Sequence, residues 1–184
     1  MKEQHARPAP APCGMDLLTG LTTRRSIRQF TGEAIPDDTL RALVLAGLSA
    51  PSARNRRPYE FVVLRSRETF RQLAEANPYA HMLPQADAVL VVCGDANCEQ
   101  KDEFLQQTCG AAVENILLAA HGLGLGAVWC GVRTGSDWEA LLGRVMHLPE
   151  GVRAMQVVAL GHPAETPAPR DYWTPEKLHW ETWD

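Results

Sequence analysis

The sequence predicts one domain that mixes helices and strands, in the α/β or α+β class. Three observations support this prediction. From the scaling of accessible surface with chain mass, a chain of 184 residues buries about 70% of its unfolded surface on folding. That is enough for a stable core without disulfides or a structural metal. Hydrophobic residues make up 45% of the chain and charged residues 22%, as is usual for globular proteins. Helical and strand-like patterns alternate along the chain, and no internal repeat is present.

The predicted elements follow from hydrophobic spacing and from proline and glycine positions. Residues 1–14 are rich in proline and alanine and predict a flexible tail, which leaves 15–184 as the single domain. A second loop-like stretch, 50–58, contains two prolines. In chain order we expect a helix over 16–20, an irregular basic segment over 22–30, a helix from 36 to about 48, a strand over 61–64, a helix over 68–76, a strand over 88–93, a helix over 99–121, a strand from 127, a helix over 136–146 and a strand over 155–160.

The longest predicted helix, from about Glu99 to His121, is apolar nearly all round in its second half. A helix that is apolar on more than one face is buried on more than one face. The residues that follow, Gly122 to Ala127, match the dinucleotide fingerprint G-x-G-x-x-A. That fingerprint needs a strand before it and a helix after it, whereas here the order is reversed. We therefore expect these glycines to cap the helix and turn the chain.

Charge and cysteine usage restrict the possible functions. The formal net charge is −4, which argues against a nucleic-acid coat or a membrane-surface binder. No apolar run approaches the roughly 18 residues of a membrane span, and residues 1–14 contain no apolar stretch typical of a secretory signal. A cytoplasmic protein is therefore expected. The five cysteines are scattered and odd in number, which favours reduced thiols, and no metal site is indicated.

Arginines are concentrated in two short segments of this acidic chain. Six of the 18 basic residues are Arg24, Arg25, Arg28, Arg54, Arg56 and Arg57. Guanidinium groups on loops can grip a phosphate with two hydrogen bonds, and Ser26 adds a hydroxyl donor. The residues alone leave two interpretations open: a phosphate site, or a pair of solvated basic loops.

Four sequence motifs follow one another along the chain: R-R-S-I-R-Q-F (24–30), A-P-S-A-R-N-R-R-P-Y-E-F (50–61), A-A-V-E-N-I-L-L-A-A-H-G-L-G-L-G-A-V-W (111–129) and G-H-P-A-E (161–165). Together they resemble the flavin-dependent nitroreductase family, in particular its short bacterial members, from about Met15 to Asp184. The resemblance implies an α+β fold with a central, mostly antiparallel sheet flanked by helices. It also implies an intertwined homodimer with FMN at the subunit interface. In such a protein NADH or NADPH reduces FMN, which then reduces nitroaromatic, quinone or other conjugated acceptors by ping-pong turnover.

The same resemblance assigns roles to residues of this chain. Arg24, with Arg25 beside it, would grip the FMN phosphate, and Ser26 would bind the ribityl or phosphate region. Arg28 would reach the N1/O2 edge of the flavin ring and stabilise the charge that hydride transfer leaves there, so no nucleophile is needed. The residues expected to bind the cofactor are Arg24, Arg25, Ser26, Arg28, Pro51, Ser52, Ala53, Asn55, Cys130, Gly131 and Arg170. Of these, the 51–55 group would come from the partner subunit, Cys130 and Gly131 would lie near the ring, and Arg170 would complete the phosphate site.

Some residues carry two interpretations. Where many relatives have glutamine in the motif N-x-Q-P-W, this chain has Arg56-Arg57-Pro58-Tyr59. The two extra positive charges either favour an anionic acceptor or the 2′-phosphate of NADPH, or they are simply solvated. His81 is either exposed or close to the flavin, and Cys130 is expected to pack. A rival function is a flavin-binding protein without turnover, for FMN storage or sensing. A nucleotide- or nucleic-acid-binding module is disfavoured by the acidic charge.

The C-terminal arm, defined as residues 171–184, contains three of the five tryptophans: Trp173, Trp180 and Trp183. A disordered tail would not normally contain so many aromatic residues. They either complete the core of their own subunit or lie across the partner, and the resemblance to intertwined dimers favours the partner.

Overall fold

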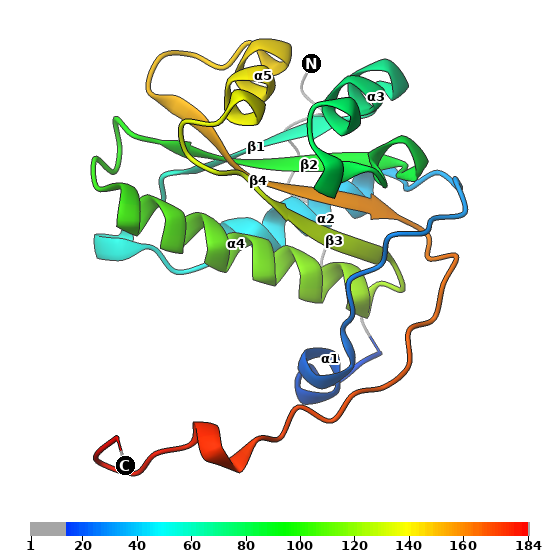
Figure 1. The fold of residues 1–184 in the computed structure, drawn as a ribbon, viewed down its shortest axis with the longest axis vertical. Helices are drawn as coiled ribbons and strands as arrows, with labels where there is room; N and C mark the ends of the chain where they lie inside the picture. Colours follow the sequence, from blue (N-terminus) through cyan, green and yellow to red (C-terminus); the bar gives the residue numbers. More distant parts are fainter. Residues whose placement is uncertain (1–13, 184) are drawn as a thin grey trace.

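A computed structural model of the protein describes residues 14–183 as a four-stranded sheet between two layers of helices (Figure 1). The strands are β1 (Tyr59–Leu64), β2 (Ala88–Asp95), β3 (Gly126–Gly131) and β4 (Val152–Gly161). The helices are α1 (Leu17–Thr23), α2 (Asp37–Leu48), α3 (Arg67–Glu75), α4 (Asp102–Gly122) and α5 (Asp137–Met146), with short 3₁₀ turns at η2 (Ala53–Asn55), η3 (Pro78–Ala80), η4 (Leu83–Gln85) and η5 (Pro175–Lys177). The strand order is β1-β2-β4-β3, and all neighbours are antiparallel.

This arrangement confirms the predicted α+β fold with a central antiparallel sheet flanked by helices. The tail predicted for 1–14 lies outside the described residues except for Gly14. Among residues 14–183 no helix is long and apolar enough to cross a membrane.

The two central strands are covered on both faces. On one face, α3 and α5 pack against the sheet through residues such as Phe70 and Trp138. On the other face, α2 and α4 do so through residues such as Leu43 and Ile116 (Figure 1). Because neither face of β2 meets water, its sequence is a continuous apolar run and not an alternation.

Helix α4 is buried on more than one face, as predicted from the apolar residues that surround its second half. Its Asn115 side chain donates a hydrogen bond to the Ala46 carbonyl of α2 at 3.1 Å. The helix begins at Asp102, later than the sequence predicted, because Glu99 turns inward and accepts the Lys101 backbone N–H at 3.1 Å. At the other end, Gly124 adopts a φ of +75° and the chain turns back, so these glycines end a helix as expected.

Other boundaries also differ from the sequence prediction: β2 ends at Asp95, and β4 begins at Val152, three residues earlier than expected. α1 continues to Thr23 because the Thr22 and Thr23 hydroxyls donate to carbonyls of the preceding turn, at 2.9 and 2.6 Å. β1 begins at Tyr59, whose hydroxyl donates to the Ala50 carbonyl at 2.9 Å. Local propensity did not reveal either side-chain contact.

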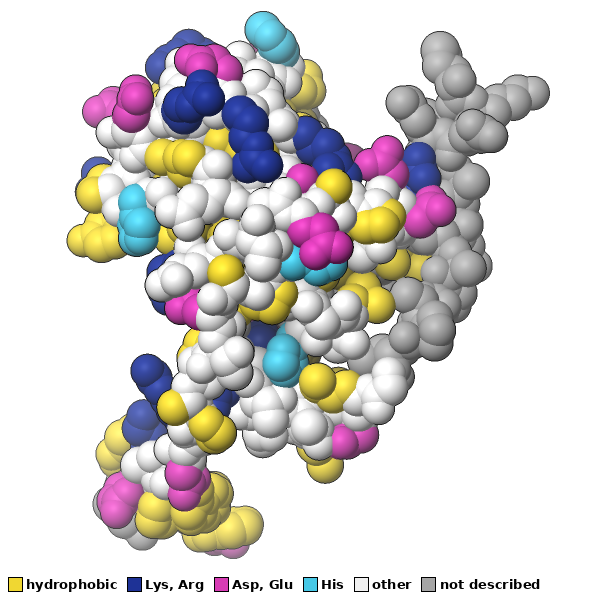
Figure 2. Space-filling model, turned by 90° about the vertical axis from the view of Figure 1, so that its right-hand side faces the viewer, with side chains coloured by type: hydrophobic (Ala, Val, Ile, Leu, Met, Phe, Trp, Pro, Cys, Tyr) yellow, Lys and Arg dark blue, Asp and Glu magenta, His cyan; other side chains and the backbone are white. Residues whose placement is uncertain are grey.

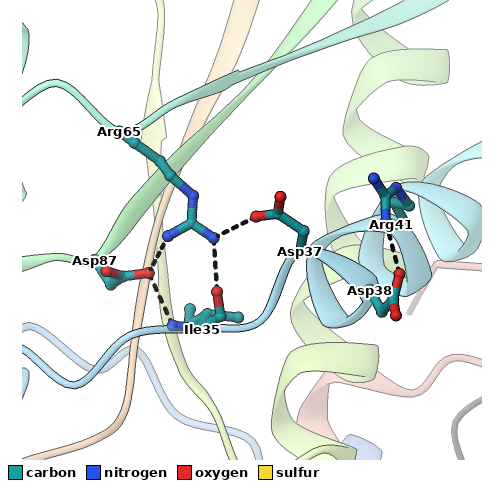
Figure 3. A network of polar contacts seen from close by, with 6 residues as sticks. All are labelled: Ile35, Asp37, Asp38, Arg41, Arg65 and Asp87. Carbon is teal, nitrogen blue, oxygen red and sulfur yellow. Dashed lines mark hydrogen bonds and ion pairs between the residues drawn. The ribbon is translucent and has the colours of Figure 1, made fainter. Parts of the chain in front are cut away.

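An acidic side chain just before β2 ties three segments together (Figure 3). Asp87 is almost fully buried, and its Oδ2 accepts from the Ile35 N–H at 2.9 Å and from Arg65 Nη1 at 2.8 Å. Arg65 Nη2 donates in addition to the Ile35 carbonyl at 2.6 Å and to Asp37 at 2.9 Å. These bonds fix the start of α2 against the ends of β1 and β2.

We expect Asp87→Ala to lower the free energy of unfolding by about 2 to 3 kcal/mol, because a buried N–H and part of a guanidinium lose their acceptor. Asp38→Ala is the matched control. Asp38 pairs with Arg41 at 2.6 Å in the same view, but its side chain is 88% exposed (Figure 3). Its loss is expected to cost less than about 1 kcal/mol. Urea unfolding measures the loss of unfolding free energy in each variant. Equal losses for Asp87→Ala and Asp38→Ala would contradict the structural role assigned to Asp87.

Candidate functional site

The arginine-rich segment 24–30 is seated directly against strand β3. Ser26 and Ala127 form an isolated parallel bridge, and the Ile27 N–H donates to the Ala127 carbonyl at 2.9 Å. The close approach depends on glycine, because a Cβ on Gly126 would lie 2.7 Å from Ile27 Cγ2. A Cβ on Gly161 would likewise lie 2.6 Å from Phe30 Cδ1. The glycines of the third and fourth motifs therefore make room for the first.

The G-H-P-A-E motif holds the same segment by hydrogen bonds. Glu165 Oε1 accepts the backbone N–H of Arg28 at 2.5 Å and that of Gln29 at 3.1 Å. The Ala164 N–H donates in turn to the Gln29 carbonyl at 2.9 Å. Because its backbone is fixed on both sides, the segment presents its arginine side chains in a defined direction.

Gly126→Ala is expected to lower the free energy of unfolding by about 1 to 3 kcal/mol, since the new methyl group meets the branched carbon of Ile27. Gly143→Ala in α5 is the control, because its Cβ meets nothing within 4 Å and alanine favours a helix. Thermal unfolding of the two variants should move in opposite directions. An unchanged midpoint for Gly126→Ala would show that the segment is not closely seated.

The first part of the site is a hollow of about 370 Å³, named here the arginine hollow. It is lined by Arg24, Arg25, Ser26, Arg28, Pro167, Arg170 and Tyr172. The structure thus brings together the four residues expected near the phosphate, Arg24, Arg25, Ser26 and Arg170, with Arg28, which was expected at the ring edge. Arg25 lies over the Tyr172 ring, 5.1 Å from its centroid, and Arg24 Nε is 3.4 Å from Glu114. Four guanidinium groups around one hollow make a strong site for an anion.

The second part is a hollow of about 330 Å³ at the edge of β3, named here the strand-edge hollow. It is lined by Arg28, Asn77, Tyr79, His81, Val128, Trp129, Cys130 and Gly131. Arg28 lines both hollows, and within residues 14–183 no hydrogen bond or ion pair to its guanidinium is found. Arg28 therefore stands where the two hollows meet.

Cys130 and His81 differ in their surroundings within the strand-edge hollow. Burial raises the pKa of the Cys130 thiol to about 11 although Arg28 opposes the shift, so the thiol stays protonated at neutral pH. Its Sγ packs 3.9 Å from Met82 Sδ, which supports the expected packing role. His81 is exposed at the rim, with Nδ1 3.2 Å from the Pro78 carbonyl.

His121 lies beside the arginine pair without adding to its charge. Its Nε2 is 2.8 Å from the Thr23 hydroxyl. Burial and then the Arg24 and Arg25 guanidiniums hold the pKa of this imidazole below its usual value. The imidazole is therefore neutral at pH 7, and the positive charge of the arginine hollow comes from guanidinium groups.

The second predicted motif lies elsewhere in the same chain. Pro51, Ser52, Ala53 and Asn55 line neither hollow, and their loop contacts the turn before α4. Arg24 instead contacts Glu114, which lies twelve residues after the first residue of α4. The rise of the helix over these twelve residues places the arginine segment about 18 Å from the start of α4, where the loop makes its contacts. One protomer therefore carries the two predicted halves of the site at separate places.

The arginines of this loop are exposed, and each makes a polar contact within the chain. Arg54 and Arg56 pair with the buried carboxylate of Glu99, at 3.0 and 3.3 Å. Arg57 Nη2 donates to the Leu48 carbonyl at 3.2 Å. No sequence pattern indicated these contacts of Glu99, which lies in a polar stretch where a helix was expected to begin.

Comparisons with known proteins identify the family. A family model described as "Nitroreductase family" matches residues 21–162. The chain belongs to the nitroreductase family. A protein of Methanothermobacter thermautotrophicus, named as a candidate NADH dehydrogenase/NAD(P)H nitroreductase, is 40% identical over 169 residues, which cover 92% of this chain and 88% of that protein.

Solved structures of nitroreductase-like proteins have the same fold. One from Parabacteroides distasonis, a candidate NADH dehydrogenase/NAD(P)H nitroreductase, has a TM-score of 0.85 at 31% identity and covers 90% of this chain and 98% of its own. One from Desulfovibrio desulfuricans, a candidate nitroreductase in complex with FMN, has a TM-score of 0.79 at 32% identity and covers 92% of this chain and 99% of its own. The residues that match the nitroreductase family include the arginine segment, the 51–55 loop and β3, whereas the C-terminal arm lies beyond them.

Proposed function

We propose that the protein is an FMN-dependent NAD(P)H oxidoreductase of the nitroreductase type. It would pass electrons by ping-pong turnover to a small conjugated acceptor such as a nitroaromatic or a quinone. The observation that supports this most is the position of Arg28 between an anion-binding hollow and a hollow at a strand edge. FMN has the matching shape, with a phosphate at one end and a flat ring at the other.

The residues present fit FMN at both ends. Arg24, Arg25 and Arg170 would neutralise the phosphate dianion, and Ser26 would donate a hydrogen bond beside them. The backbone of Cys130 and Gly131 would face the ring. FMN, when bound, accepts hydride from the nicotinamide and supplies electrons to the acceptor.

Arg28 has the electrostatic role in this proposal. Negative charge collects at the pyrimidine edge of a flavin as it is reduced. A guanidinium that is already fixed beside that edge stabilises the charge without reorganisation of water or protein. The hydrogen bonds that the backbone N–H groups of Arg28 and Gln29 donate to the Glu165 carboxylate hold Arg28 in place for this role.

We further propose that the site is completed by a second copy of the chain. The loop that carries Pro51, Ser52, Ala53 and Asn55 lines neither hollow in its own protomer. In a homodimer the loop of one protomer would meet the arginine segment of the other, which gives two equal sites.

The C-terminal arm supports the homodimer. It leaves the body beside α1 and projects away from it (Figure 1), and hydrophobic side chains gather at its end (Figure 2). Trp173, Trp180 and Trp183 are 71%, 79% and 88% exposed, so they do not complete the core of their own subunit. Aromatic side chains of this size are buried in stable proteins, and a partner subunit would cover them.

Anaerobic mixing of the FMN-loaded protein with NADH, and separately with NADPH, tests the proposed function. Bleaching of the flavin absorbance with at least one donor is expected, followed by reoxidation when a quinone or nitroaromatic is added. Unchanged spectra with both donors would favour a flavin-binding protein without turnover. A protein that stays colourless after incubation with FMN would contradict both.

A further inference from the structure

The loop between α2 and β1 has an unusual backbone. Arg54, Asn55 and Arg57 have positive φ angles of 54°, 53° and 52°. Residues other than glycine rarely adopt this region, and they remain in it where surrounding contacts enforce it. Asn55 is also one of the residues proposed to contact FMN. The contacts that hold this loop therefore bear on the flavin site.

A buried carboxylate makes the charged contacts to the loop. Glu99 is 1% exposed, and its Oε2 lies 3.0 Å from Arg54 Nη2 and 3.3 Å from Arg56 Nη1. Its Oε1 accepts the Lys101 backbone N–H at 3.1 Å, which anchors the carboxylate to the turn before α4. This backbone hydrogen bond, and after it the Arg56 and Arg54 charges, keep the pKa of Glu99 below its usual value. The carboxylate is therefore ionised and bridges the loop to α4.

The remaining contacts secure the flanks of the loop. Ser52 Oγ accepts the Arg57 N–H at 2.9 Å, and Cys98 Sγ lies 3.1 Å from the Arg56 carbonyl. The Arg54 guanidinium also lies over the Phe104 ring of α4, 5.6 Å from its centroid. None of these contacts replaces the charge of Glu99, and a buried carboxylate in turn needs its two guanidinium partners.

We infer that Glu99 is a positioning residue for the cofactor: through Arg54 and Arg56 it fixes the loop that meets FMN across the dimer interface. This inference rests on the proposed function. It also gives Arg54 and Arg56 a structural role within the chain, because each guanidinium pairs with the Glu99 carboxylate.

Glu99→Gln tests this role, since glutamine keeps the size and the oxygen that accepts the Lys101 N–H but removes the charge. The dissociation constant of FMN, measured by quenching of flavin fluorescence, should rise roughly tenfold, as the loss of supporting contacts does at metal sites. Glu103→Gln is the matched control, an exposed acid in the first turn of α4, and should leave the constant unchanged. Equal FMN affinity for Glu99→Gln and wild type would overturn the inference.

A double-variant cycle separates positioning from a general loss of structure. Asn55→Gly keeps the positive φ and removes the amide that would contact FMN. If Glu99 acts through the loop, Glu99→Gln weakens FMN binding much less in the Asn55→Gly background than in wild type. Multiplicative losses would instead indicate independent effects and would overturn the inference.

Two further outcomes are distinguishable. If Glu99→Gln does not fold, Arg54→Gln removes one of the two ion pairs from a half-exposed residue, and the same cycle is measured with that variant. A wild-type protein that binds no FMN would overturn the proposed function itself. Wild-type binding with an unaffected Glu99→Gln would leave the proposed function intact and remove this inference alone.

Discussion

A chain that ends at Arg170 is expected to be a monomer or an aggregate that retains no FMN. The truncation removes Trp173, Trp180 and Trp183, which are exposed in the protomer and proposed to lie across the partner. Each tryptophan buries on the order of 150–250 Å² when packed, and an isologous dimer uses each arm twice, so the loss amounts to several kcal/mol. Sedimentation velocity and flavin absorbance measure the two losses together.

Tyr172 also disappears in this truncation, and it lines the arginine hollow. A full-length variant with serine at the three tryptophan positions separates the two effects, because it retains Tyr172. That variant should lose the dimer and FMN as well, whereas Tyr172→Ala should remain a dimer. A truncated chain that stays a fully loaded dimer would contradict the role of the C-terminal arm.

Arg28→Ala is expected to weaken FMN binding about ten- to hundredfold, the value of a hydrogen bond to a charged group. It should also lower the two-electron reduction potential of the flavin by about 30 mV or more, equivalent to about 1.4 kcal/mol, because the reduced flavin loses its nearest cation. Titration with FMN and dye-coupled potentiometry measure the two quantities.

Arg24→Ala is the comparison variant for Arg28→Ala. Arg24 lines the arginine hollow but not the strand-edge hollow, so its loss should reduce affinity with a smaller effect on the potential. Arg144→Ala, at an exposed position of α5 that lines neither hollow, should change neither. Wild-type affinity and potential in Arg28→Ala would refute the assignment of Arg28.

The parts of the fold that follow from local patterns were predictable from the sequence. The apolar run of β2 indicated a central strand, and the apolar second half of α4 indicated a helix that is buried on more than one face; the structure confirms both. The reversed order around Gly122 to Ala127 correctly excluded a dinucleotide fingerprint. The start of α4 was misplaced because the inward turn of Glu99 depends on Arg54 and Arg56, which are 45 and 43 residues away in the chain.

The candidate site likewise contains residues that could be predicted from sequence motifs and contacts that could not. The sequence motifs pointed to Arg24, Arg25, Ser26, Arg28, Cys130, Gly131 and Arg170, and all of these line one or both of the two hollows. Gly126 and Gly161 are motif residues, but the space that they leave for Ile27 and Phe30 depends on packing between distant segments and so could not be predicted. The ion pairs of Glu99 could not be predicted, because charge pairing between distant segments leaves no periodic pattern in one sequence.

Flavin stoichiometry in mixed dimers tests most directly the central claim that one site is built from two protomers. One protomer carries Arg24→Ala and Arg28→Ala, the other carries Asn55→Gly, and two different affinity tags isolate the mixed dimer. If the site is shared, both defects fall in one site and the other site is intact, so the mixed dimer binds one FMN with wild-type affinity. If each site lies within one protomer, every site carries a defect, and the absence of any wild-type site would contradict the account.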